Sequence, residues 1–503
     1  MRRGEPETRP SDPPSDPGKR VTDRPPLTLG LKLAYAAGAL LDGVATQAVN
    51  IFLFFYMTAV CGAPPALAGA AVAVGLVVDA VVDPLIGSMS DGLRSKWGRR
   101  APFMIWGAPL TALFVVLIFS LPTALGGLAL VAWITVLSIG LRVSISLFLL
   151  PYNAVGAELS EDYAERSSIA AWRWGAAMIG ALVAILLGFG VFFGGPEGLT
   201  RRAAYTPFAL SIGAIALLGA ALAIRALFLT RDRQHVAPVE TGAAHLRFLR
   251  ALGEIFGNQS FRVLFVGGIL LFSALSVHST LGLHANTYFW RLAPKQTQVV
   301  TLALFVGLLL GAPLAGPLLK WLEKRMVLLV GIVGLGAAFA GPATLRLLGL
   351  LPFEGDQLVV VLASAVFAGG ALMAAAGIAF ASMMADAADE HEYLFGARRE
   401  GLYFAGWAFA SKAAAGLGAF VAGLGLQLIG FKSATAGTAI QALPPGTLAW
   451  IGILYGPGAG LLALAAAVNC LFYRLDLVSH ARILRALRER RSVPDRLAAE
   501  MAS

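Results

Sequence analysis

The sequence predicts an all-α membrane protein that crosses the bilayer many times, and three observations carry this prediction. Of 503 residues, 57% are hydrophobic and 14% charged, with a mean hydropathy of +0.74, which is more apolar surface than a soluble core of this length hides. About twelve stretches of about 20 apolar residues alternate with short polar connectors, a pattern typical of helices rather than barrel strands. Basic residues gather on alternate connectors.

That charge asymmetry predicts the orientation of the chain. Roughly thirty Lys and Arg fall on one set of connectors and on both tails, against about five on the other set, and the positive side is the cytoplasmic one. We therefore expect an integral protein of the plasma (inner) membrane with both termini in the cytoplasm. Topology and anionic lipid headgroups account for the net charge of +10, so the bilayer is the expected partner and nucleic acid is not.

The chain divides in order into five parts. Residues 1–28 are polar and proline-rich, which predicts a disordered cytoplasmic tail and no cleavable signal peptide. Residues 29–230 and 261–474 each hold six apolar spans, joined by a polar connector at 231–260, and residues 475–503 form a basic cytoplasmic tail. A basic connector follows the second span of each group and an acidic-basic connector follows the fourth, so we expect two equivalent six-helix bundles.

The second span carries two aspartates, Asp79 and Asp83, in "VVDAVVDPLIG". Four residues apart on a helix, their carboxylates project from one face about 6 Å apart. Unpaired carboxylates are costly at membrane depth, so they must be protonated, bound to a cation or paired with a basic side chain. A cation or proton site is the functional interpretation, and a static salt bridge between helices is the alternative.

Three basic residues lie within the spans, namely Arg142, Arg173 and Lys412. Each needs an acidic partner or a water-filled cavity. Lys412, in "FASKAAAG", faces a stretch of small residues that gives it room to reach the aspartate pair. Arg173 stands between Trp172 and Trp174, where it either binds a polar ligand or extends to the membrane surface.

Weaker signals come from other polar residues of the spans. Gln47 and Asn50 share a face of the first span, and other groups that line a cavity or form interhelical hydrogen bonds are Asp42, Ser144, Ser146 and Asn153. The two histidines of the seventh span, His278 and His284, are six residues apart and point to different faces, so we expect no metal site. We find no nucleophile, phosphate-loop or cofactor motif and expect a protein that is not an enzyme and has no cofactor.

The segment "DPLIGSMSDGLRSKWGRRAPFM" resembles the loop after the second helix of the glycoside-pentoside-hexuronide:cation symporters, the melibiose-carrier branch of the major facilitator superfamily. The resemblance covers almost the whole chain, from "KLAYAAGALLDG" through "AAWRWGAAMIG" to "MADAADEHEYLFGARREG" and "FASKAAAGLGAF". It implies a major facilitator fold of 12 transmembrane helices in two six-helix halves.

The resemblance also implies roles for individual residues. Asp79 and Asp83 would bind the coupling cation with a hydroxyl from Ser146, Lys412 would communicate with that site, and Arg173 would lie near the sugar. The cytoplasmic gate would comprise Asp91, Arg99 and Arg100, with a second-half counterpart made of Asp386, Asp389, Arg398 and Arg399.

Several positions depart from the melibiose carriers. Gly43 and Leu149 replace acidic residues that bind sugar hydroxyls there, and Asp42 is one residue away, about 100° round the helix. Asn153 and Gly377 replace tryptophans. Val82, between the two aspartates, replaces an asparagine, which removes a neutral oxygen ligand and favours H⁺ over Na⁺ as the coupling ion.

The predicted function is cation- or proton-coupled symport of a sugar or glycoside-like solute by alternating access, by a monomer. Substrate contacts are expected from Arg173, Trp172, Gln47, Asn50, Asn153 and Asp42. One alternative is a transporter of a non-sugar amphiphile such as a lysophospholipid. The other is a non-transporting membrane sensor, against which the costly buried acids argue.

Overall fold

The computed structural model describes residues 26–160, 162–195, 198–231, 253–397, 399–431 and 443–502. Within these residues the chain is helical, and twelve helices are long and apolar enough to cross a membrane. The predicted fold class is confirmed. Most of the N-terminal tail expected at 1–28 lies outside the described residues. The same is true of most of the connector at 231–260 and of Arg398.

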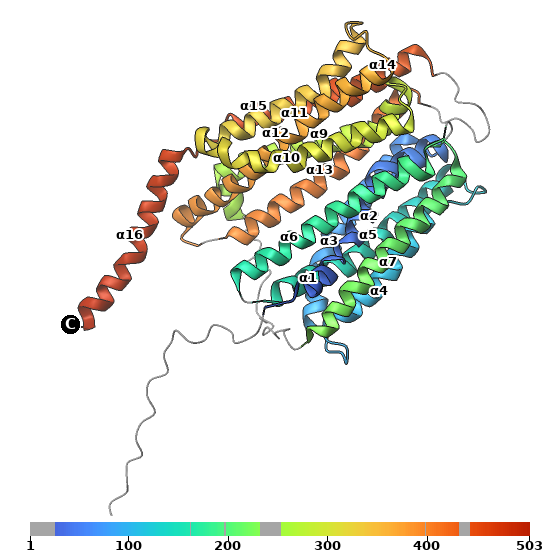
Figure 1. The fold of residues 1–503 in the computed structure, drawn as a ribbon. Coiled ribbons are helices and arrows are strands. Elements are labelled where there is room, and N and C mark those ends of the chain that lie inside the picture. Colours follow the sequence, from blue (N-terminus) through green and yellow to red (C-terminus); the bar gives the residue numbers. More distant parts are fainter. Residues whose placement is uncertain are drawn as a thin grey trace, which may run out of the picture.

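The helices form two bundles that lie side by side (Figure 1). The first bundle comprises α1 (Leu29–Ala36), α2 (Ala39–Ala48), η1 (Val49–Leu53), η2 (Tyr56–Val60), α3 (Pro65–Gly92), α4 (Ala101–Ile118), α5 (Gly127–Glu158), α6 (Tyr163–Ile185), η3 (Leu186–Phe192), η4 (Arg202–Ala204) and α7 (Tyr205–Leu229). The second comprises α9 (Gln259–His284), η6 (Ala285–Phe289), α10 (Pro294–Trp321), α11 (Lys324–Leu347), α12 (Gly355–Phe395), α13 (Glu400–Leu428), α14 (Pro445–Ile453), η7 (Leu454–Gly458) and α15 (Ala459–Cys470). A further helix, α16 (Leu477–Ala502), projects away from the bundles in Figure 1.

The helix neighbours repeat from one bundle to the other. In the first bundle α2 packs on α6, α3 on α5, and α4 on α7; in the second, α9 packs on α13, α10 on α12, and α11 on α15. Helix pairs at matching places in the two groups of six therefore make matching contacts. This repeat is the equivalence of halves that the sequence predicts.

The two bundles have two distinguishable ends. We call the end with the connectors 93–100, 322–323 and 396–399 the basic end, and the other the opposite end. The bundles meet chiefly along α3 and α13, with further contacts of η1 on α9 and of η3 on α10. Because η1 and η3 finish the first and fifth spans at the opposite end, the bundles are joined there.

Glycines allow α3 and α13 to approach closely near the opposite end. A Cβ on Gly423 would lie 2.3 Å from the carbonyl oxygen of Pro65, and one on Gly69 would lie 2.5 Å from that of Ala419. Such distances leave no room for a side chain. Close backbone approach through small residues is how helices associate in lipid, where the hydrophobic effect adds little.

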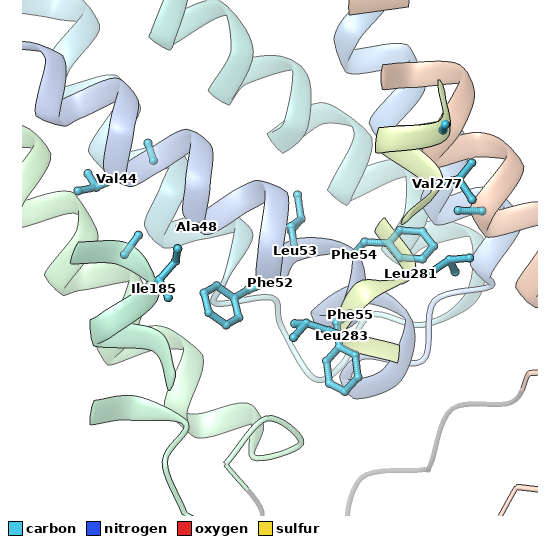
Figure 2. Packing of buried hydrophobic residues seen from close by; sticks show 14 of the residues in the cluster. Val44, Ala48, Phe52, Leu53, Phe54, Phe55, Ile185, Val277, Leu281 and Leu283 are labelled. Atoms are coloured by element: carbon cyan, nitrogen blue, oxygen red, sulfur yellow. The ribbon is translucent and has the colours of Figure 1, made fainter. Parts of the chain in front are cut away.

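Apolar side chains seal the opposite end (Figure 2). Leu53, Phe54 and Phe55 of the first span pack near Val277 and Leu281 of α9, and all five are buried. One polar contact crosses the halves within this seal: the Thr58 hydroxyl lies 2.9 Å from Nε2 of His284. The opposite end is therefore closed.

The substitution Gly423→Ala tests the close approach. We expect it to destabilise the fold by about 1–3 kcal/mol because the added methyl overpacks the interface, and thermal unfolding in detergent measures this. The control is Gly316→Ala on α10, where a Cβ meets nothing within 4 Å. Equal melting temperatures for the two variants would contradict the packing described.

Candidate functional site

The acid pair and its hydroxyl lie at the contact of α3 with α5. Ser146 Oγ is 3.0 Å from Oδ1 of Asp79 and 2.6 Å from Oδ1 of Asp83. The Asp79 side chain is 9% exposed and that of Asp83 22% exposed. The i,i+4 spacing on α3 sets the two carboxylates on one face, as the sequence predicts, and that face meets protein rather than hydrocarbon.

Lys412 reaches this pair from the other half of the protein. Its Nζ is 3.0 Å from Oδ2 of Asp79 and also contacts Oδ2 of Asp83. The contact expected between Lys412 and the aspartates is present. Since α3 and α13 belong to different bundles, one ammonium group joins the two halves through two carboxylates.

Arg142 is a member of this site that the sequence leaves unassigned. Ser138, Arg142 and Ser146 recur every four residues on α5 and so share one face. That face meets Gly75 of α3, one turn from Asp79: a Cβ on Gly75 would lie 3.7 Å from Cγ of Arg142. The arginine also lines a small cavity of about 20 Å³.

Asp42 belongs to the same group of charges. Its Oδ1 accepts a hydrogen bond of 2.8 Å from Thr46, and its charge interacts with Arg142, Asp79 and Lys412. Arg142 in turn interacts with all three carboxylates. We call Asp42, Asp79, Asp83, Arg142 and Lys412 the acid cluster. The sequence shows that Gly75 and Asp79 share one face of α3 and that Arg142 and Ser146 share one face of α5, because each pair is four residues apart. Only the packing of the helices reveals that these two faces meet.

A second site lies nearer the basic end, where α5 and α6 approach. Arg173 donates to Oδ1 of Asn153, and its guanidinium carbon is 4.7 Å from the ring centre of Tyr152. Gly156 makes the space, because a Cβ there would lie 2.8 Å from Nη1 of Arg173. Asn153 and Ser146 are seven residues apart on α5, a rise of roughly 10 Å.

The aromatic contact of Arg173 does not come from the tryptophans next to it in sequence. The ring beneath the guanidinium is Tyr152, whereas Trp172 and Trp174 are 43% and 56% exposed and make no ring contact with it among the described residues. Successive helix residues point about 100° apart, so neighbours in sequence diverge in space. The remaining expected contacts, Gln47 and Asn50, make no hydrogen bond to the described residues.

The gate residues of the first half form one cluster at the basic end. Arg100 Nη2 is 3.0 Å from Asp91 and 2.7 Å from Glu158, and Arg99 is also 2.7 Å from Glu158. Glu158, at the end of α5, is a member that the sequence does not assign. It joins α5 to the loop between α3 and α4.

The described contacts of the second-half acidic residues include partners that the sequence does not assign. Asp386 pairs with Lys324 at 2.6 Å, and Asp389 lies 3.2 Å from Nε2 of His480. Arg399 precedes α13, where its charge acts on His391, and Arg398 is not described. The loop arginines follow a left-handed turn at Gly396 that the sequence repeat does not reveal.

Twelve spans in two matching halves, with a charge cluster that joins them, define a transporter of the major facilitator class. The model of the family of MFS/sugar transport proteins matches residues 34–477. The chain belongs to this family, and the resemblance to glycoside-pentoside-hexuronide:cation symporters is confirmed.

Individual relatives agree with this assignment. A protein of Synechocystis sp. described as an uncharacterized symporter is 27% identical, covering 91% of this chain and 96% of its own. The isoprimeverose transporter of Lactiplantibacillus pentosus is 26% identical, covering 89% of both chains. A solved structure of a variant of the nucleoside transporter NupG superposes with a TM-score of 0.62 at 14% identity, over 88% of this chain and 99% of that one, which shows the shared fold.

We expect Arg142→Gln to lower the melting temperature more than a control substitution at an exposed arginine. Without the guanidinium, three carboxylates share one ammonium group, which is costly away from water. Arg225→Gln is the control, because Arg225 is exposed on α7 and has no charged partner among the described residues. Equal melting temperatures for the two variants would contradict a charge-balancing role of Arg142.

We expect Glu158→Gln to destabilise the protein by about 1–3 kcal/mol, since one carboxylate accepts from both Arg99 and Arg100 in a largely buried setting. Glu354→Gln serves for comparison, because Glu354 is 84% exposed and 4.0 Å from its arginine, a geometry that contributes little. Thermal unfolding of both variants measures the difference. Similar values would contradict a structural role for the Glu158 cluster.

Proposed function

We propose that this protein is a secondary active symporter that moves a sugar-type solute together with a cation by alternating access. The observation that carries the proposal is the contact of Lys412 with Asp79 and Asp83 across the two halves. A cation that takes the place of the ammonium group would release the halves from each other. Family membership and relatives described as a symporter and a sugar transporter support the same class.

The coupling ion we propose is the proton. The described oxygens at the pair are two carboxylates and one hydroxyl, a small shell for a hard cation, which prefers many oxygen ligands. Val82 adds no ligand. Carboxylates brought together need only one proton to relieve their repulsion.

The contacts at the two ends of the bundles bear on which state of the transport cycle the structure represents. The opposite end is sealed by apolar packing, while the ion pairs of Glu158 and of Asp386 at the basic end each join residues of one half. Separation at the basic end therefore breaks none of these pairs. Under the positive-inside rule the basic end faces the cytoplasm, so we assign the structure to the inward-facing half of the cycle.

Asp83→Asn tests the proposal in proteoliposomes with imposed H⁺ and Na⁺ gradients. We expect the variant to lose gradient-driven accumulation at least tenfold, because an amide binds no exchangeable cation. Exchange at equal substrate concentrations needs no gradient and should persist, which shows that the variant is folded. Asp356→Asn is the control, since Asp356 lies at the opposite end and accepts from Gln296. Accumulation by the Asp83 variant equal to that of the parent protein would contradict coupling at this pair.

A further inference from the structure

A groove of about 600 Å³ runs between α4 and α7 on the outer face of the first bundle. The buried alanines Ala108 of α4 and Ala220 of α7 form its floor, and larger apolar side chains such as Leu217 and Phe228 form its walls. Both helices pack on each other and on other helices of the first bundle, on the side away from the second bundle (Figure 1). The groove therefore opens towards the bilayer and not towards the acid cluster.

The length and level of the groove match one leaflet of a bilayer. On α7 its lining residues extend from Leu217 to Leu229, the last residue of the helix, a rise of roughly 18 Å. Half of the hydrocarbon core of a bilayer is roughly 15 Å thick. On α4, Trp106 is 65% exposed in the second turn, and exposed tryptophans are typical of the level of the headgroups. Since α7 finishes at the basic end, the groove spans the cytoplasmic leaflet.

Arg225 supplies a positive charge at the cytoplasmic end of the groove, whose other described lining residues are all apolar. Arg225 lies roughly 6 Å from the end of α7, four residues before Leu229. Its side chain is exposed, and no described residue pairs with its charge. Just beyond the helix, Arg231 donates a hydrogen bond of 2.6 Å to the carbonyl oxygen of Lys96, which brings two further cations to this end. An apolar groove thus leads to a site that favours an anion.

We propose that this groove binds an anionic phospholipid of the cytoplasmic leaflet, such as phosphatidylglycerol, with an acyl chain between α4 and α7 and the phosphate on Arg225. The planar guanidinium matches two phosphate oxygens by forked hydrogen bonds. A zwitterionic lipid carries its own ammonium group and leaves the charge of Arg225 unbalanced, whereas an anionic lipid balances it. The lipid is a bound component of the membrane and not the transported solute, because the described lining residues all belong to α4 and α7.

Two lipids with the same acyl chains test the headgroup: dioleoylphosphatidylglycerol, which is anionic, and dioleoylphosphatidylcholine, which is zwitterionic. The purified protein in detergent is mixed with both at equal concentration, and native mass spectrometry identifies the first lipid that remains bound. We expect a preference of about tenfold for phosphatidylglycerol, the scale of one charge-assisted hydrogen bond. Phosphatidylglycerol should also raise the melting temperature more than phosphatidylcholine does, because a ligand of the folded state stabilises it.

Arg225→Gln removes the charge and keeps the groove. We expect this variant to lose the preference for phosphatidylglycerol and to melt like the parent protein when no lipid is added, which shows that it is folded. Arg262→Gln is the matched control, because Arg262 is an exposed arginine in the first turn of α9 at the basic end and does not line the groove. The control should keep the preference.

Ala221→Phe fills the groove and keeps Arg225, since Ala221 is an exposed lining residue of α7. We expect it to weaken the binding of phosphatidylglycerol about tenfold, because the added ring takes the place of acyl carbons whose burial contributes to binding. Ala214→Phe adds the same ring at an exposed position of α7, two turns away and outside the groove. It should bind phosphatidylglycerol as the parent protein does.

Each contrary outcome overturns a stated part of the inference. A preference that survives in Arg225→Gln, or that is lost equally in Arg262→Gln, would overturn the binding of the phosphate by Arg225. Unchanged binding by Ala221→Phe would overturn the place of the acyl chain. Inorganic phosphate that stabilises the protein as much as phosphatidylglycerol would show a site for free anions and overturn the lipid assignment, as would a parent protein that retains neither lipid. None of these measurements depends on transport, so the proposed function is tested separately.

Discussion

The contact of one ammonium group with two carboxylates across the halves is the constraint on which the rest of the structure depends. Lys412 belongs to α13, and Asp79 and Asp83 belong to α3. If the ammonium group moves away from the carboxylates, each side is left with an uncompensated charge in a low-dielectric setting, and this raises the free energy of the protein. The two bundles are therefore held together at this depth unless another positive charge satisfies the carboxylates, which is the physical basis for a coupled change of conformation.

The packing on either side of that contact decides which end of the protein separates. Towards the opposite end, Gly69 and Gly423 bring the two backbones together, and the aromatic seal around Phe54 and Phe55 adds buried area. Towards the basic end, the described ion pairs of Glu158 and Asp386 stabilise each bundle internally. Opening at the basic end leaves the ion pairs of Glu158 and of Asp386 intact. Opening at the opposite end exposes apolar surface to water and breaks the contact of Thr58 with His284.

The parts of this arrangement that the sequence predicts are those set by a single helix. Twelve spans follow from hydropathy, and the common face of Asp79 and Asp83 follows from a spacing of four residues. What the sequence does not reveal are contacts between faces of different helices. Arg142 lies against Gly75 of α3, one turn from Asp79. Tyr152, rather than either neighbouring tryptophan, lies beside Arg173 because successive residues on a helix point in different directions.

Contacts of connectors and helix ends are also hard to predict, since their geometry depends on local turns. The resemblance groups Asp386 and Asp389 with two loop arginines, of which Arg398 lies outside the described residues. The structure adds partners that the sequence does not suggest: Lys324, from the start of α11, pairs with Asp386, and His480 of α16 approaches Asp389. Both partners come from helix ends that approach α12 in space, and neither lies near the acidic residues in sequence.

The contacts of Ser146 bear on the proton that we propose for the acid pair. A hydroxyl donates one hydrogen, yet Ser146 Oγ lies within hydrogen-bond distance of an oxygen from each aspartate. With both carboxylates ionised, one of these contacts would set lone pairs against each other. A proton on either carboxyl group lets that group donate to Ser146 while Ser146 donates to the other, so both contacts become hydrogen bonds. The position of Ser146 between the two carboxyl groups is therefore the geometry expected of the proton site proposed above.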